Sequence, residues 1–180
     1  MRPLLSADGL IEAGFDEESW PAFVERVAET LNVGPGTRVW DVTCGAGSFL
    51  LPLYLNGYVV GGNDASADSL DLAREAMPDA RFIAGEPVDL DPAEPWEVVV
   101  ASRGLAGCET RDETRALVAR MAAKATHAIA LLRVDEVHGP AIDRATLLHV
   151  LVEVGLSAVH FEGDGRLNVY ARVNPPEGLF

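Results

Sequence analysis

The feature that most constrains the fold is an apolar segment that runs directly into a glycine turn. Residues 39–50 read Val-Trp-Asp-Val-Thr-Cys-Gly-Ala-Gly-Ser-Phe-Leu, which predicts a strand, a tight turn at Gly45 and Gly47, and the start of a helix. Glycines let a ligand lie against the backbone, and the first N–H groups of a helix face the same space. A second predicted strand ends at Asp64, where a carboxylate can accept both hydroxyls of a ribose. The pair predicts a nucleotide-type pocket.

Two ligand classes use this geometry, and two positions separate them. The dinucleotide fingerprint needs a third glycine for close helix packing, and Leu50 stands there. It has no need of an acid at the end of the first strand, where this chain has Asp41. A carboxylate at that point favours an ammonium group and repels a pyrophosphate. The expected ligand is therefore positively charged at this end.

Residues 41–47 resemble motif I of the class I S-adenosylmethionine-dependent methyltransferases, and Ala-Ser after Asp64 matches the second motif of that family. The similarity extends over about residues 36–134 and is strongest in its first part. It implies S-adenosylmethionine as cofactor and S-adenosylhomocysteine as product. The chain departs from the pattern twice: Thr43 replaces the first glycine of motif I, and Glu86-Pro87 replaces Asp-Ala.

The resemblance also implies roles for individual residues. Asp41 and the Gly45 backbone would hold the methionine amino group, Asp64 the ribose, and Glu86 the adenine amine. Ser102 would lie beside the methyl-donor sulfur. The full predicted cofactor-binding set is Asp41, Thr43, Gly45, Ala46, Gly47, Asp64, Ala65, Ser66, Glu86, Pro87 and Ser102.

Two residues are predicted to act on the acceptor. Arg103 follows the strand at about 97–101, where it would either clamp a substrate carboxylate or pair with a surface acid. His138 lies beyond the fifth strand, on the sheet edge that faces ligands in open α/β sheets. It would serve as a general base, or else be a solvated or structural histidine.

Composition bounds the function classes. With 180 residues and 48% hydrophobic content the chain fits one compact domain. The formal charge of -14 disfavours nucleic acid and anionic membrane surfaces as partners. Two cysteines, one of them inside the glycine turn, do not indicate a disulfide framework, and no run approaches a membrane span or a signal peptide. We therefore expect a soluble cytoplasmic protein with no metal site.

Strands and helices alternate along the chain until two final strands form a hairpin. This predicts a Rossmann-like α/β fold: a seven-stranded, mostly parallel, doubly wound sheet with a C-terminal antiparallel hairpin. Residues 1–34 are predicted as an N-terminal arm and helix that form a candidate lid. Residues 35–175 are predicted as the S-adenosylmethionine-binding, methyltransferase-like domain, and residues 176–180 as a tail.

The sequence favours methyl transfer from S-adenosylmethionine to a small-molecule acceptor. Alternatives are another use of the cofactor, such as cyclising its aminobutyrate part, and a degenerate cofactor-binding or partner module. Only the segments before residue 34 and at 134–142 could cover the site. Such brief cover indicates either a small acceptor or a pocket completed by a second subunit in a homodimer.

Overall fold

The computed structural model describes residues 19–87, 94–105, 107–134, 142–162 and 167–173. The strands are β1 (Arg38–Asp41), β2 (Val59–Asp64), β3 (Arg81–Ala84), β4 (Trp96–Ala101), β5 (Ala125–Leu131), β6 (Ser157–Glu162) and β7 (Asn168–Arg172). The helices are α2 (Ser19–Leu31), α3 (Leu50–Leu55), α4 (Ala67–Ala76), α5 (Arg111–Lys124) and α6 (Arg144–Glu153).

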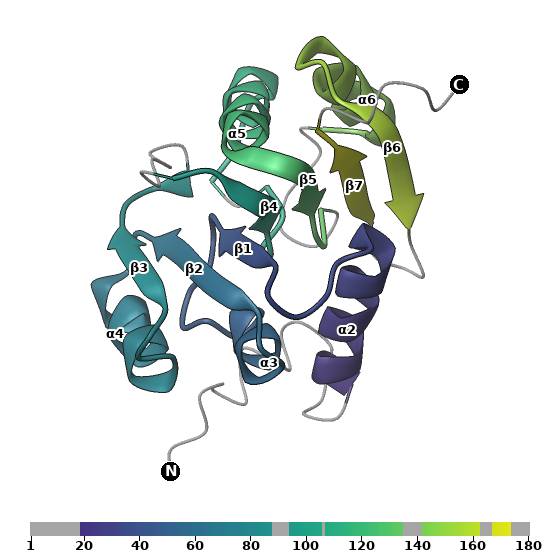
Figure 1. The fold of residues 1–180 in the computed structure, drawn as a ribbon. Helices are drawn as coiled ribbons and strands as arrows, with labels where there is room; N and C mark the ends of the chain where they lie inside the picture. Colours follow the sequence, from purple (N-terminus) through teal and green to yellow (C-terminus); the bar gives the residue numbers. More distant parts are fainter. Residues whose placement is uncertain (1–18, 88–93, 106, 135–141, 163–166, 174–180) are drawn as a thin grey trace.

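The seven strands form one sheet in the order β3-β2-β1-β4-β5-β7-β6 (Figure 1). Strands β1 to β5 are parallel, whereas β7 runs antiparallel between β5 and β6. The predicted fold class is confirmed, including the C-terminal antiparallel pair. The residues between these two strands, 163–166, which would form the turn of the predicted hairpin, lie outside the described residues.

Helices cover both faces of the sheet, as expected of a doubly wound fold (Figure 1). Helices α2, α3 and α4 pack on one face, and α5 and α6 on the other. Alternate β4 residues belong to the two cores: Val98 and Val100 face the first, and Val99 faces the second. All three are fully buried, which explains why β4 is an almost continuous apolar run.

Three helices begin at a residue whose side chain caps the first turn. Ser66 caps α4 by accepting from the Ser69 N–H, and Asp143 caps α6. Thr110 and Glu113 form a reciprocal capping box at the start of α5. Each capping side chain accepts from the backbone N–H of the residue three positions further on, so local sequence suffices to predict these caps.

The sheet reverses its direction of winding between β1 and β4. The chain proceeds from β1 outward to β2 and β3, then returns to place β4 on the other side of β1. In register, Asp41 lies opposite Gly62 of β2 and Val100 of β4. The carboxyl ends of these strands therefore meet at one edge, the position at which open α/β sheets bind ligands.

Candidate active site at the strand ends

Asp41 ends β1 as a fully buried carboxylate. Its Oδ1 accepts hydrogen bonds from the backbone N–H groups of Thr43 (2.9 Å) and Ser102 (3.2 Å). Oδ2 is buried and has no hydrogen-bond partner in the described part of the chain. Burial raises the pKa of Asp41, and the bonds from Ser102 and Thr43 oppose that shift without cancelling it. Asp41 therefore holds the turns after β1 and β4 together and retains one unused oxygen.

Thr43, at the position of the first motif glycine, joins the same two turns. Its hydroxyl oxygen lies 3.3 Å from Asp41 Oδ1 and accepts the Arg103 N–H at 3.0 Å. Its carbonyl oxygen accepts from the Ser102 hydroxyl at 3.4 Å. Thr43 is absent from the described residues with positive φ, so its backbone does not require glycine.

Asp64, at the end of β2, organises the glycine turn. Oδ2 accepts from the Gly45 N–H and Oδ1 from the Ser66 N–H, both at 2.9 Å. Gly45 has φ +52°, the left-handed region that glycine adopts without strain. The predicted ribose-binding carboxylate is thus also a backbone acceptor, and it links the turn after β1 to the start of α4.

Asn63 was not identified from the sequence, yet it positions the loop after β3. Its Oδ1 accepts from the buried Trp40 indole N–H at 2.9 Å, and its Nδ2 donates to the Glu86 carbonyl at 3.1 Å. Asn63 is itself buried. The available signal was a polar amide within an apolar strand, because a buried amide needs partners and connects whatever supplies them.

A cavity of about 190 Å³ opens among these turns. Six of the predicted site residues line it: Thr43, Asp64, Ala65, Glu86, Pro87 and Arg103. Val42 and Gly107 also line it and were not predicted. The structure therefore brings the motif I turn, the tip of β2, the loop after β3 and the turn after β4 around one space.

Seven other predicted residues do not line this cavity or lie outside the residues that the structure describes. Asp41, Gly45, Ala46, Gly47, Ser66 and Ser102 are not in the cavity lining. Gly47 packs against α4, since a Cβ there would meet the Met77 side chain. His138 lies outside the described residues.

The cavity is lined by both acidic and basic side chains. Asp64 and Glu86 come from the ends of β2 and β3, and Arg103 comes from the other side of β1, after β4. The Arg103 side chain is exposed and forms no ion pair within the described part of the chain. The alternative that it pairs with a surface acid is thus not seen there, and Arg103 lines a space that can admit a ligand.

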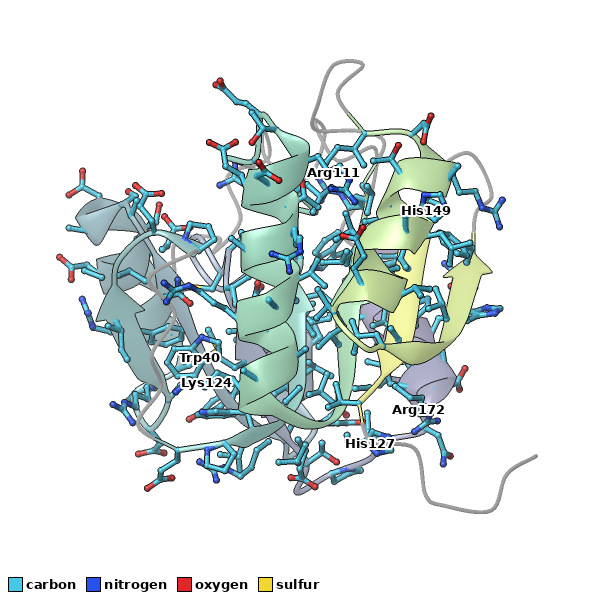
Figure 2. All side chains as sticks on the ribbon, turned by 90° about the horizontal axis from the view of Figure 1, so that it is seen from above. Trp40, Arg111, Lys124, His127, His149 and Arg172 are labelled. Carbon is cyan, nitrogen blue, oxygen red and sulfur yellow. The ribbon has the colours of Figure 1, made fainter. Side chains whose placement is uncertain are left out.

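Three other histidines lie away from the cavity. His127 is near the start of β5, at the opposite edge of the sheet, where its Nε2 lies 2.6 Å from Arg172 Nη1 (Figure 2). His149 is exposed on α6 (Figure 2), and His160 of β6 stacks on Tyr170 with ring centroids 6.0 Å apart. A cavity of about 360 Å³ between α2 and α3 is larger, but it lies off the strand ends. Neither these histidines nor this larger cavity brings together the residues that end the parallel strands.

Helix α2 packs on the core next to the glycine turn. Trp20 is buried, and its indole N–H donates to the Ser48 carbonyl at 2.8 Å. The Arg133 guanidinium, after β5, lies 6.0 Å from the Trp20 ring centroid. The start of α2 and the segment that follows β5 therefore meet beside the glycine turn. The first 18 residues of the predicted arm and helix lie outside the described residues.

Within the described residues, no group of three or more His, Cys, Asp and Glu side chains is arranged to hold a metal ion. Cys44 and Cys108 are both free and buried. Among the described helices, none combines the length and apolar character that crossing a bilayer requires.

No family model matches the chain. A 66-residue stretch, 34% of this chain, is 39% identical to a 23S rRNA (uracil-C5)-methyltransferase of Thiobacillus denitrificans and spans only 15% of that protein. Similar solved structures cover far more of the chain. CalS10, an amino pentose methyltransferase from Micromonospora echinaspora solved with S-adenosylmethionine bound, is 17% identical with a TM-score of 0.76, over 92% of this chain and 95% of that one.

Two further solved structures are similar to this chain over most of its length. DesVI of Streptomyces venezuelae is 17% identical, with a TM-score of 0.72 over 86% of this chain and 92% of that one. Magnesium protoporphyrin IX methyltransferase from Synechocystis, also solved with S-adenosylmethionine, is 20% identical, with a TM-score of 0.67 over 84% and 78%. The chain has the fold of class I S-adenosylmethionine-dependent methyltransferases, as its motif I residues indicated.

Proposed function

We propose that this protein is an enzyme that transfers a methyl group from S-adenosylmethionine to a small-molecule acceptor. The observation that carries the proposal is the cavity at the reversal point of the sheet, which gathers Thr43, Asp64, Glu86 and Arg103 from four separate strand ends. Ligands of open α/β sheets bind at this position. The bound cofactor would supply a methyl group activated on a sulfonium.

The residues present suit such a cofactor. Asp41 keeps a buried Oδ2 that has no hydrogen-bond partner among the described residues, which favours a cationic group nearby. Asp64 is partly exposed, so its oxygens can accept ribose hydroxyls beside the two N–H groups that they already bind. Glu86 is held by Asn63 at the predicted adenine end. Together these carboxylates favour a cationic nucleoside over a pyrophosphate.

Methyl transfer from a sulfonium disperses positive charge, so alignment and exclusion of water matter more than a strong catalytic group. In this proposal the turns after β1 and β4 align the reactants, and Arg103 orients the acceptor. His138 would accept a proton from the acceptor or orient it.

We propose a small molecule as acceptor because a chain with a formal charge of -14 repels a phosphate backbone. The amino pentose and porphyrin methyltransferases among the structural neighbours support this class. The short match to an rRNA methyltransferase covers too little of that protein to favour RNA.

The acceptor would lie between Arg103, His138 and the N-terminal arm. The contact of Arg133 with Trp20 supports this placement, because it joins the segment before His138 to the helix that follows the arm. A second copy of the chain is the alternative cover. Removing residues 1–15 should abolish turnover and spare cofactor affinity, and His138→Ala should slow turnover with a shifted pH profile. Wild-type turnover by the truncated protein would refute the lid.

Product analysis tests the reaction. The purified protein is incubated with methyl-labelled S-adenosylmethionine and a library of small acceptors, and products are separated by mass spectrometry. A labelled acceptor with S-adenosylhomocysteine supports the proposal. Methylthioadenosine with a cyclised amino acid would indicate the non-methylating reaction, and unchanged cofactor would indicate a binding module. Calorimetry adds a direct check: tight binding of NAD without binding of S-adenosylhomocysteine would refute the cofactor assignment.

A further inference from the structure

The turn after β4 is held from two sides. On the β5 side, Gly104 has φ +61°, and a Cβ built there would lie 2.8 Å from the Leu132 carbonyl oxygen. The Leu132 N–H donates to the Ala101 carbonyl at 3.0 Å. On the β1 side the contacts come from Thr43 and Asp41. Arg103 stands between these two attachments, with its side chain exposed at the cavity.

The Thr43 hydroxyl makes the side-chain contact to Arg103 itself. One hydroxyl has one donor and two acceptor sites, so Oγ1 can donate to Asp41 Oδ1 and accept the Arg103 N–H at the same time. Threonine is β-branched, and its restricted χ1 keeps this oxygen in place. Thr43 is only 4% exposed, so little water competes for either bond.

We propose that Thr43 is a positioning residue that fixes the Arg103 backbone at the cavity. A glycine at this position would leave the Arg103 N–H without this acceptor. The part of the cavity lining that Arg103 forms would then have to become ordered when ligand binds. This inference rests on the proposed function, because the turn that Thr43 holds carries both Ser102, predicted beside the methyl-donor sulfur, and Arg103, predicted to orient the acceptor. It assigns a role to the residue by which this chain departs from the motif.

Three variants separate the hydroxyl from the shape of the side chain. Thr43→Val keeps the β-branched shape and removes the hydroxyl, Thr43→Ser keeps the hydroxyl, and Thr43→Gly removes both. The first measurement is the rate of amide hydrogen exchange at Arg103, which NMR records on the free protein. The Leu132 amide, whose acceptor is a backbone carbonyl, is the internal control.

We expect the Arg103 amide to exchange about tenfold faster in Thr43→Val and Thr43→Gly than in wild type or Thr43→Ser. Exchange at Leu132 should be the same in all four proteins. If Thr43→Val does not fold, the comparison of Thr43→Gly with Thr43→Ser decides the question. Equal protection of Arg103 with and without the hydroxyl would overturn the proposal.

The second measurement is the affinity for S-adenosylhomocysteine by calorimetry. The dissociation constant should rise about fivefold in Thr43→Val and return to the wild-type value in Thr43→Ser. Unchanged affinity in Thr43→Val would also overturn the proposal. If wild type binds no S-adenosylhomocysteine, the cofactor assignment fails, whereas amide exchange still reports whether Thr43 holds Arg103.

Discussion

Replacing Asp64 with alanine tests both roles of the carboxylate that ends β2. Its two oxygens each accept one backbone N–H at 2.9 Å, from Gly45 and from Ser66. A hydrogen bond to a charged group contributes about 1.5–3 kcal/mol when buried. Asp64 is partly exposed, so water can replace some of each bond, and we expect the loss of both to cost about 2 kcal/mol of folding free energy.

The effect on ligand affinity follows from the same carboxylate. Loss of its bonds to the ribose should weaken S-adenosylhomocysteine binding by about 1–3 kcal/mol, which is roughly a 5- to 150-fold increase in the dissociation constant. Calorimetry measures this affinity, and urea unfolding measures the stability. The protein should remain folded, because the Asp64 side chain belongs to neither core and alanine keeps the backbone pairing of this position with Ala84.

Glu75→Ala is the matched control. Glu75 is exposed on α4, so its removal changes the net charge equally without touching the turn. We expect this variant to bind S-adenosylhomocysteine as wild type does. If Asp64→Ala binds with wild-type affinity, or loses no more affinity than Glu75→Ala, the ribose does not lie at Asp64 and the reasoning from the strand end is wrong.

Three further substitutions test the supports of the site. Asn63→Leu should cost about 1–3 kcal/mol in urea unfolding, because it leaves the buried Trp40 indole N–H without its acceptor; an unchanged midpoint would contradict the role of Asn63. Gly62→Ala should lower the free energy of unfolding by about 1–3 kcal/mol, because the new Cβ would lie 2.7 Å from the Asp41 carbonyl oxygen. The control Gly34→Ala places its Cβ in open space and should lower it far less. Equal melting temperatures of the two variants would refute this packing argument. Burial raises the folded-state pKa of Asp41 above 3.8, so its contribution to stability is complete below that pH and is lost as pH rises through the raised pKa. Asp41→Asn should therefore gain stability relative to wild type as pH rises in urea unfolding, and a difference that stays constant with pH would show that Asp41 does not titrate this way.

Local sequence was sufficient to predict the order of elements and most of their ends. Local signals include the apolar run of β4 and the caps at Ser66, Thr110 and Asp143. Another is Gly155, which follows α6 with φ +85° and donates its N–H to the Val152 carbonyl. Periodicity and capping carry that information directly. The glycine turn after β1 is also a local feature, so the sequence predicts it directly. The position of a ligand at that turn then follows from the topology of the sheet.

Contacts made across long sequence separations could not be predicted in this way. Thr43 appeared to be a defect in the motif, and only the packing of β4 beside β1 reveals that its hydroxyl accepts the N–H of Arg103, 60 positions away. The amide of Asn63 in an apolar strand indicated that it needs partners, but only the tertiary structure identifies them as Trp40 and Glu86.

The same distinction applies to the charges of the site. The sequence determined that carboxylates end β1 and β2, because those residues are part of the strands themselves. Only the tertiary structure decided that Asp41 would be fully buried, with one oxygen that no described residue pairs, while Asp64 stays accessible at the cavity. Burial depends on what neighbouring strands and turns place over a residue, and for Asp41 the turn after β4, 61 positions away, supplies part of that cover.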